Sequence, residues 1–221
     1  MKLVLISKSK EATFLLGELI ANLVKPSSVL ALDGGLGAGK TKLSSGIAKG
    51  LKCQEELISP TFTILRDYEI NKQYGNQDGY TSTSAEQLMP IYHMDAYRLK
   101  DYKEFEQNGF DEYFDRGGLT IVEWAEIIEE VLPKRTIRIN FNIEDQNENI
   151  SFDDFLRSLE DEAERESAFL SQNGGETNDT SKGNYEDDRP RVISISADED
   201  FCVSLKKEIK SRADNDLYVK E

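Results

Sequence analysis

The residues with the clearest chemical capacity form a run of glycines that ends in lysine and threonine. Residues 34–41, Gly-Gly-Leu-Gly-Ala-Gly-Lys-Thr, match the pattern G-x-x-x-x-G-K-[ST], in which glycines let backbone N–H groups turn towards a phosphate. Lys40 can reach the outer phosphates, and the Thr41 hydroxyl suits a magnesium ion. We call residues 34–41 the glycine-rich loop. We predict that it binds a nucleotide and Mg²⁺ through Gly35, Leu36, Gly37, Ala38, Gly39, Lys40 and Thr41.

Two carboxylates are candidates for the rest of such a site. Asp95 ends the apolar run 90–95, and Glu123 ends the run that begins at Leu119. Magnesium bound with phosphates usually takes one or two carboxylates. If both runs are strands of an α/β sheet, their ends lie at the edge where phosphates bind. We therefore predict metal-binding and catalytic roles for Asp95 and Glu123, with Thr41 as a further metal ligand. The sequence leaves open which carboxylate touches the metal and which orients water.

Four residues beside these motifs each have more than one interpretation. Thr61 lies where related folds place a segment that senses the terminal phosphate, so it is a catalytic candidate, although it also suits a turn. Arg98 could neutralise charge in phosphoryl transfer, contact a partner or form a surface salt bridge. His93, the only histidine, suits packing or hydrogen bonding better than catalysis. Trp124 should lie near the nucleotide or pack in the core.

Strands and helices of a suitable kind surround these residues. A short apolar run precedes the glycine-rich loop, and apolar residues at helical spacing follow it, so the loop should join a strand to a helix. Strands separated by helices predict a three-layer α/β fold of the P-loop NTPase type, with a mixed, mainly parallel central sheet. We predict strands at 3–6, 28–32, 61–70, 90–95, 119–124, 136–143 and 192–196, and helices at 12–23, after 41, at 101–107, 125–131 and 201–211.

The chain divides into an ATPase-like domain, an acidic insert and a closing segment. Residues 1–143 carry every motif above, and 71–85 is expected to be an exposed loop. Residues 144–189 contain fifteen acidic and four basic residues. They begin with an amphipathic helical pattern over 152–163 and end in a Gly-, Asn- and Asp-rich linker. Residues 190–221 are expected to return a strand and a helix to the same domain.

Composition narrows the class of protein. The net charge of −15 comes mostly from the insert, so the main domain is not barred from nucleic acid by its charge. Cys53 and Cys202 are the only cysteines, which favours reduced structural thiols over a disulfide or metal site. No apolar run approaches the roughly 20 residues needed to span a bilayer, and we expect a cytoplasmic protein without membrane contact.

Four motifs in order resemble the TsaE family. They are Gly34-Gly35-Leu36-Gly37-Ala38-Gly39-Lys40-Thr41, Ser59-Pro60-Thr61-Phe62, His93-Met94-Asp95-Ala96-Tyr97-Arg98-Leu99 and Glu123-Trp124. The family is the ATPase component of the bacterial machinery that makes threonylcarbamoyladenosine in tRNA. The resemblance covers roughly residues 1–143 and, weakly, the final strand and helix. The chain departs from the family at Gly35, where aspartate is usual.

The resemblance implies a function and partners. It implies ATP and Mg²⁺ as cofactors, weak intrinsic ATP hydrolysis, and association with TsaD and TsaB, the subunits that perform and support threonylcarbamoyl transfer. Contact with tRNA would be indirect or through that complex. Lys40 and Thr41 would serve the phosphates and metal, Thr61 the switch segment, and Asp95 and Glu123 the metal and hydrolysis.

The residues alone also permit a small-molecule or nucleoside kinase, or a nucleotide-gated binding module. No N-K-x-D sequence for guanine recognition is present, which argues against a GTPase.

Overall fold

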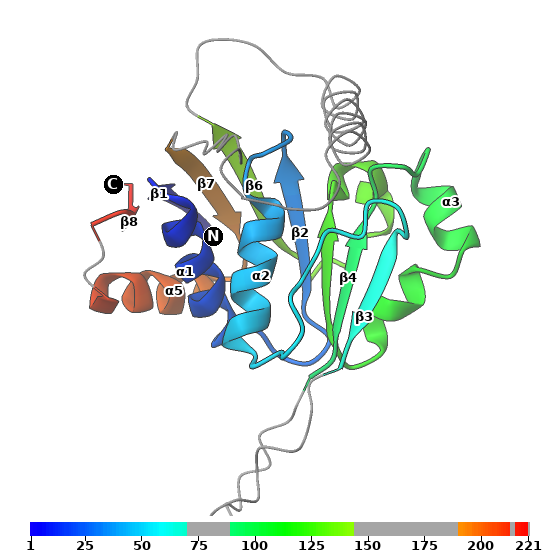
Figure 1. The fold of residues 1–221 in the computed structure, drawn as a ribbon, viewed down its shortest axis with the longest axis horizontal. Helices are drawn as coiled ribbons and strands as arrows, with labels where there is room; N and C mark the ends of the chain where they lie inside the picture. Colours follow the sequence, from blue (N-terminus) through cyan, green and yellow to red (C-terminus); the bar gives the residue numbers. More distant parts are fainter. Residues whose placement is uncertain (70–88, 144–189, 213–214, 221) are drawn as a thin grey trace, which may run out of the picture.

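A computed structural model describes residues 1–69, 89–143, 190–212 and 215–220. These residues form one eight-stranded sheet with helices on both faces (Figure 1). The strands are β1 (Lys2–Ser7), β2 (Val29–Gly34), β3 (Leu65–Tyr68), β4 (Ile91–Asp95), β5 (Leu119–Glu123), β6 (Ile137–Ile143), β7 (Arg191–Ser196) and β8 (Leu217–Val219). The helices are α1 (Lys10–Ala21), α2 (Lys40–Gly50), α3 (Tyr102–Gln107), α5 (Glu199–Arg212) and the 3₁₀ helices η2 (Asp111–Asp115) and η3 (Ala125–Val131).

The sheet is parallel at its centre and antiparallel at its edges. The strand order is β3-β4-β5-β2-β6-β7-β1-β8. Strands β4, β5, β2 and β6 run parallel to one another, whereas β3, β7 and β8 run in the opposite direction. The prediction of a mixed, mainly parallel sheet in a three-layer fold is confirmed.

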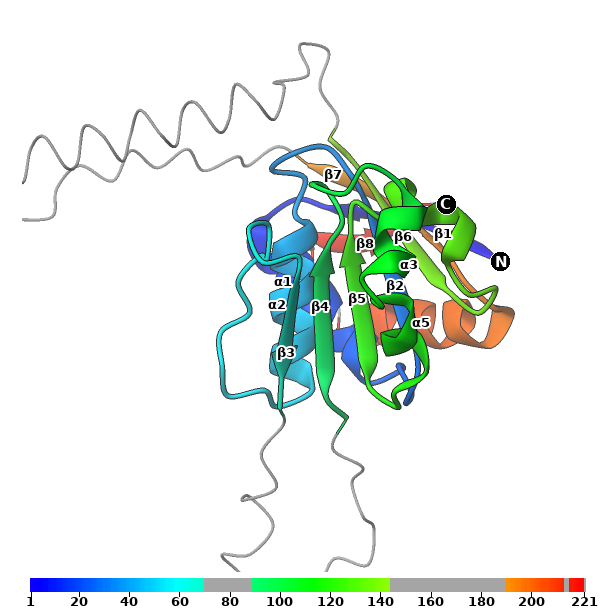
Figure 2. The same cartoon turned by 90° about the vertical axis from the view of Figure 1, so that its right-hand side faces the viewer.

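Alternate residues of the central strands pack into two separate cores. Leu30 and Leu32 face a large cluster under α1, α2 and α5, while Val29 and Ala31 face a smaller cluster under α3, η2 and η3. Figure 2 shows the strands between these two layers. Burial on both faces explains why residues 29–32 of β2 form an unbroken apolar run, as parallel strands usually do.

Helix α2 is held in place by a close contact with α1. The Ser9 side chain caps α1 by accepting a hydrogen bond from the Ala12 N–H. Farther along α1, a Cβ at Gly17 would lie 2.3 Å from the Leu43 carbonyl oxygen, and one at Gly46 would lie 2.1 Å from that of Phe14. The two helices therefore meet backbone to backbone, which fixes the start of α2 beneath the glycine-rich loop.

The prediction of a strand over residues 61–70 is wrong for its first part. Residues 61–63 form a turn in which the Pro60 carbonyl accepts hydrogen bonds from the N–H groups of Thr63 and Ile64, and β3 starts only at Leu65. The segment over 125–131 is helical but 3₁₀ in type. Strand β6 is antiparallel to β7 and parallel to β2. The loop predicted at 71–85 and the helix at 152–163 lie outside the described residues.

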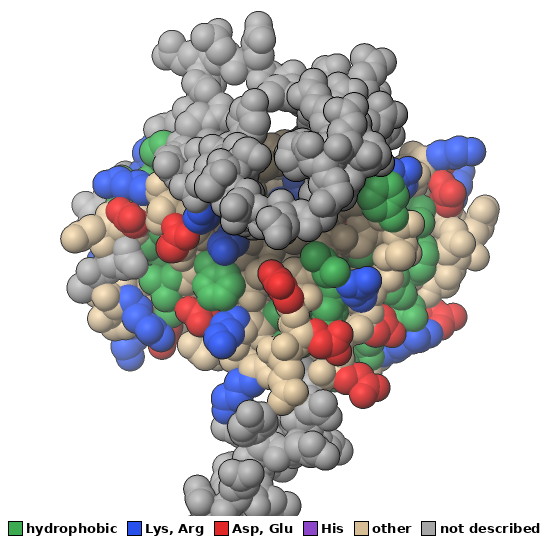
Figure 3. All heavy atoms as spheres, viewed as in Figure 1, with side chains coloured by type: hydrophobic (Ala, Val, Ile, Leu, Met, Phe, Trp, Pro, Cys, Tyr) green, Lys and Arg blue, Asp and Glu red, His purple; other side chains and the backbone are tan. Residues whose placement is uncertain are grey.

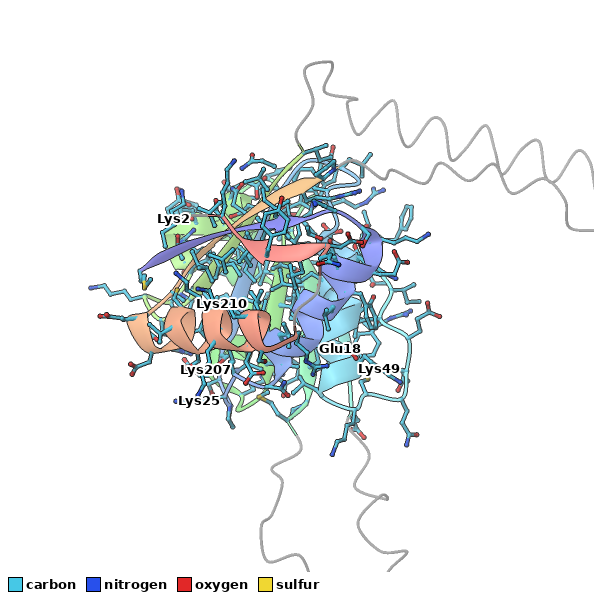
Figure 4. The ribbon with its side chains drawn as sticks, turned by 90° about the vertical axis from the view of Figure 1, so that its left-hand side faces the viewer. Lys2, Glu18, Lys25, Lys49, Lys207 and Lys210 are labelled. Atoms are coloured by element: carbon cyan, nitrogen blue, oxygen red, sulfur yellow. The ribbon has the colours of Figure 1, made fainter. Side chains whose placement is uncertain are left out.

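The described surface mixes charges of both signs. Figure 3 shows basic and acidic side chains interspersed over the described part of one face. Helix α5 lies beside α1, and Lys207 and Lys210 project from it (Figure 4). Within the described ranges, no helix has the length and apolar character needed to cross a bilayer. Cys53 and Cys202 are both free thiols.

Candidate functional site

The candidate site lies where β2, β4 and β5 end beside the start of α2. Strand β2 leads directly into the glycine-rich loop and then into α2 (Figure 1). Strands β5 and β2 are parallel neighbours, as are β4 and β5, and Asp95 lies directly opposite Glu123 in their register. The carboxyl ends of parallel strands share one edge. The fold therefore brings both predicted carboxylates to the loop.

The loop has a backbone that depends on glycine at its two ends. Gly34 has φ 136°, and a Cβ there would lie 2.6 Å from the Phe141 carbonyl oxygen. Gly39 has φ 109° and immediately precedes α2 as its N-cap. Side chains rarely tolerate these conformations. The N–H groups at the start of α2 have no partners within the helix, so the positive end of its dipole lies at the loop.

Lys40 is a buried cation whose hydrogen bonds go to neutral groups. Its Nζ donates to the Gly34 carbonyl at 2.6 Å and to the Gly35 carbonyl at 3.0 Å, and lies 4.0 Å from the centre of the Trp124 ring. Burial lowers the pKa of the Lys40 ammonium, and the nearby carboxylates, Glu123 foremost, act against that shift. In the described part of the chain, no carboxylate lies within ion-pair distance of Lys40. A buried ammonium in this setting favours an anion.

Each oxygen of the Glu123 carboxylate has its own partner. Oε2 accepts a hydrogen bond from the Thr41 hydroxyl at 3.1 Å, and Oε1 lies 2.9 Å from His93 Nε2. Glu123 is 3% exposed and His93 is fully buried. The carboxylate therefore joins the first turn of α2 to the middle of β4.

Asp95 is held instead by the turn that precedes β3. Its Oδ2 accepts hydrogen bonds from the hydroxyls of Thr61 at 2.7 Å and Ser59 at 3.1 Å, and its Oδ1 accepts one from the Tyr97 N–H at 3.0 Å. The Asp95 N–H donates to the carbonyl of Ile64, a β-branched residue with φ 66°. Such a φ is strained for isoleucine. The turn is thus tied to Asp95 at several points.

A second pair of carboxylates, Asp33 and Glu126, also lies near Lys40. The Asp33 Oδ1 accepts a hydrogen bond from the Glu126 N–H at 2.9 Å. Part of the Glu126 side chain reaches solvent, yet partial burial of its carboxyl, followed by its hydrogen bond with Asp33, raises the pKa of Glu126 to about 7. Glu126 can therefore change charge near neutral pH.

Aromatic residues complete the edge of the site. Trp124 has φ 58°, a left-handed conformation that is unusual for a bulky residue, and it bends the chain after β5 so that the indole lies over Lys40. The Tyr97 ring meets the Trp124 ring edge to face at 4.9 Å. Arg98 lies over the ring of Phe62, which is 78% exposed. Arg98 therefore faces solvent beside the Thr61 turn.

Comparison with known proteins identifies the family. The model of the family described as threonylcarbamoyl adenosine biosynthesis protein TsaE matches residues 7–151, well over half of the chain. The chain belongs to the TsaE family. The motifs that suggested the resemblance lie within the matched residues.

Individual TsaE proteins agree with this assignment. The chain is 43% identical to tRNA threonylcarbamoyladenosine biosynthesis protein TsaE of Bacillus subtilis over 129 residues, which cover 58% of this chain and 70% of the relative. It is 34% identical to the TsaE protein of Treponema pallidum over 138 residues, which cover 62% of this chain and 90% of the relative. A crystal structure of Bacillus subtilis YdiB is 26% identical with a TM-score of 0.56, covering 97% of each chain. The three-layer P-loop NTPase fold is thereby confirmed.

The structure brings together the TsaE motif residues predicted from the sequence. Lys40, Thr41 and Glu123 form one connected group, and Thr61 and Asp95 form a second beside it. A Cβ built at Gly35, where the family usually has aspartate, meets nothing within 4 Å. The backbone of Gly35 nevertheless contributes a carbonyl to Lys40. The roles of these residues in binding and catalysis stay predictions.

Sequence reasoning missed several partners of these residues. Ser59 shares Asp95 with Thr61, and His93 holds Glu123, although neither was proposed as a site residue. A signal existed for His93: it stands two positions before Asp95 in a strand, so both side chains lie on the same face. No local pattern linked Asp33 to Glu126, because they are 93 residues apart and meet only through the pairing of β2 with β5.

Proposed function

We propose that this protein is an ATPase required for threonylcarbamoyladenosine modification of tRNA, hydrolysing ATP to drive or reset the threonylcarbamoyl-transfer complex without performing the transfer itself. Membership of the TsaE family indicates the process, which is threonylcarbamoyladenosine biosynthesis. The observation that carries the ATPase role is the convergence of Lys40, Thr41 and Glu123 at the end of parallel strands, with Asp95 and Thr61 beside them. This set of side chains suits a nucleoside triphosphate and a divalent cation.

The surroundings of Lys40 support a triphosphate as the ligand. Lys40 is 5% exposed, and among the described residues its ammonium donates hydrogen bonds only to the uncharged carbonyls of Gly34 and Gly35. A buried cation of this kind is expensive without a counter-charge. Phosphate oxygens at the loop would supply that charge, and the open N–H groups at the start of α2 would donate to them. The ring of Trp124 would cover Lys40 on the other side.

The hydroxyl of Thr41 and the carboxylate of Glu123 fit Mg²⁺. Hydroxyl and carboxylate oxygens are ligands that this ion prefers, and it usually combines one or two protein carboxylates with phosphate oxygens and water. Within the described residues, no cluster of three or more acidic, histidine or cysteine side chains could hold a metal alone, which agrees with a site completed by phosphate. Mg²⁺, when bound, would neutralise charge on the phosphates.

The contacts favour different roles for the two carboxylates. Glu123 is bonded to Thr41, so we assign it to the metal and to the orientation of the attacking water. Asp95 is bonded to Thr61, so we assign it to the segment that responds to the terminal phosphate, with a direct metal contact as the alternative.

ATP hydrolysis would act on partner proteins. We propose that the protein acts in the cytoplasm with TsaD and TsaB and reaches tRNA only through that complex. Hydrolysis by the isolated protein would then be weak, because nothing in the cycle resets without the partners. Support comes from the family assignment and from the Thr61 turn, which is bonded to Asp95 and carries the exposed Phe62.

A binding experiment tests the ATP site directly. Lys40→Ala should abolish ATP binding measured by calorimetry, because it removes the buried ammonium. Lys49→Ala, on the same helix but exposed, is the matched control and should bind as the wild type does. Equal affinity in the wild type and Lys40→Ala would contradict the proposal.

A second experiment tests the role in the complex. The protein is used as bait with TsaD and TsaB, with and without ATP, and released phosphate is measured. We expect ATP-dependent association and phosphate release that increases with the partners. Transfer of the γ-phosphate to a small acceptor would instead indicate a kinase, and association without turnover would indicate a nucleotide-gated binding module.

A further inference from the structure

His93 is a polar residue in an apolar position. It lies in β4 on the same face as Ile91, and its register partner in β5 is Ile121; all three side chains are fully buried. A hydrophobic residue of similar size would satisfy this part of the core without the desolvation cost of an imidazole. Packing alone therefore does not account for histidine here.

The hydrogen bonds of His93 define how its ring is used. Nε2 lies 2.9 Å from Glu123 Oε1, and an ionised carboxylate can only accept, so Nε2 carries the hydrogen. Nδ1 is buried, and it has no partner among the described residues. A buried lone pair without a partner is tolerated better than a buried N–H, which fits a neutral ring that donates through Nε2. Within the part of the chain that the structure describes, Glu123 is thus the one polar contact of the ring.

The second anchor of Glu123 is the one that ligand binding would disturb. Thr41 donates its hydroxyl hydrogen to Oε2, and this same hydroxyl is the group assigned to Mg²⁺ under the proposed function. Coordination of this oxygen by a cation would reposition the hydroxyl, so the Thr41 anchor depends on whether the site is occupied. The His93 contact comes from the core side of the carboxylate and involves no ligand-binding group. It can therefore persist throughout a catalytic cycle.

We propose that His93 is a positioning residue, which fixes Oε1 of Glu123 so that Oε2 stays directed at Thr41 and the metal. The inference rests on the proposed function. It follows the general behaviour of metal sites, where a partner behind a ligand fixes its orientation and its loss typically costs about 10- to 100-fold in metal affinity or activity. His93 touches neither nucleotide nor metal in this role.

The test compares His93→Leu with His93→Gln. Leucine removes the donor and keeps a buried side chain, whereas the glutamine amide can place an N–H near the position of Nε2. Trp124, the only tryptophan, lies 4.0 Å from the Lys40 ammonium and gives a fluorescence signal for ATP binding that does not require turnover. The full-length protein is used throughout, with TsaD and TsaB added for turnover.

We expect His93→Leu to lower kcat about 10- to 100-fold, with the KM for ATP changed by less than about threefold. The Mg²⁺ concentration that half-saturates the ATP-dependent fluorescence change should rise about tenfold. His93→Gln should recover most of both losses. Ile91→Ala, a cavity on the same strand face, is the control for core damage. At an equal loss of Tm, it should leave the Mg²⁺ requirement unchanged.

Two results would overturn the inference. One is an unchanged Mg²⁺ requirement in a folded His93→Leu protein. The other is equal loss in His93→Leu, His93→Gln and Ile91→Ala, which would mean that His93 only supports the core. Failure of the proposed function differs from both: Lys40→Ala would bind ATP as the wild type does, and Glu123→Gln would keep full turnover.

Discussion

The Glu123 and Asp95 regions differ although the two residues are neighbours in the sheet. Both carboxylates are at most 3% exposed and lie opposite each other on β4 and β5. Glu123 is held by the first turn of α2 and by His93 in the middle of a strand. Asp95 is held mainly by hydroxyls of one short turn.

The difference indicates a division of work. Helix α2 and strand β4 are packed in the core, so the position of Glu123 can change little. The Thr61 turn has exposed residues on it, including Phe62, and contains the strained Ile64 backbone. A segment with few buried contacts can move at low cost. We infer that the Glu123 region serves the chemistry and that the Asp95 region conveys the state of the site to a partner.

The largest expected effect is the loss of turnover in Glu123→Gln. The amide keeps the size of the side chain but removes its charge, so turnover should fall at least about 100-fold. ATP affinity should stay within about threefold, because Lys40 and the glycine-rich loop are untouched. Phosphate release and an ATP titration of Trp124 fluorescence measure the two quantities. Glu129→Gln, in the exposed pair with Arg138, is the control. Undiminished turnover would remove Glu123 from the mechanism.

The next effect is a combined loss of stability and coupling in Asp95→Ala. This change leaves Ser59, Thr61 and the Tyr97 N–H without their acceptor, so the free energy of unfolding should fall by about 2–4 kcal/mol. Urea unfolding measures this. Stimulation of turnover by partners should be lost to a greater degree than basal turnover. If instead Asp95→Ala keeps wild-type stability and loses basal turnover as fully as Glu123→Gln, the proposed division between the two regions is wrong.

A smaller effect is expected when the Thr61 hydroxyl is removed. Thr61→Val deletes one hydrogen bond to Asp95, while Thr61→Ser keeps it. The valine variant should lose about 1–2 kcal/mol of unfolding free energy, since hydrogen bonds to charged groups lie at the upper end of the usual range. Partner-dependent turnover should fall in the valine variant and persist in the serine variant. Equal behaviour of the two variants would show that the hydroxyl does not link the turn to the site.

The sequence predicted the Glu123 region better than the Asp95 region. The glycine-rich loop has a strict residue pattern because its backbone leaves little choice at Gly34 and Gly39, and apolar runs ending in acids placed Asp95 and Glu123 at the same edge. The Thr61 turn was predicted as strand because its β-branched and aromatic residues favour one. Hydrogen bonds from the N–H groups of Thr63 and Ile64 to the Pro60 carbonyl override that propensity and hold Ile64 at a positive φ.

Contacts between distant segments were beyond local patterns. The backbone contact of α1 with α2 needs glycine at both positions 17 and 46, yet each glycine by itself only weakens a helix prediction. Strand β8 is three residues long and is recognisable only through its pairing with β1. His93 was expected to pack or to form a hydrogen bond, but nothing near it in sequence identifies Glu123, 2.9 Å away, as its partner.

The smallest expected effect is a pH dependence of the stability that comes from Glu126, three residues after Glu123. Partial burial raises the pKa of Glu126 from 4.5 to about 7. Between these values the unfolded chain has released the proton that the folded protein still holds, so the stability falls as pH rises through this window and is constant above it. Solvent screening at this partly exposed site limits the loss to under about 1 kcal/mol. Glu126→Gln should remove this loss. The stability of the variant relative to the wild type should therefore be greater at pH 8 than at pH 5.

Urea unfolding of wild type, Glu126→Gln and Glu129→Gln at pH 5 and pH 8 measures this difference. The Glu129 variant should keep the pH dependence of the wild type, because the Glu129 carboxylate pairs with Arg138 at the surface and has no part in the Asp33 contact. Identical pH dependence in all three proteins would show that Glu126 ionises freely beside Asp33. A difference confined to Glu126→Gln would instead place a group that titrates near pH 7 next to Lys40, so that the charge facing a bound anion depends on pH on the Glu123 side of the site.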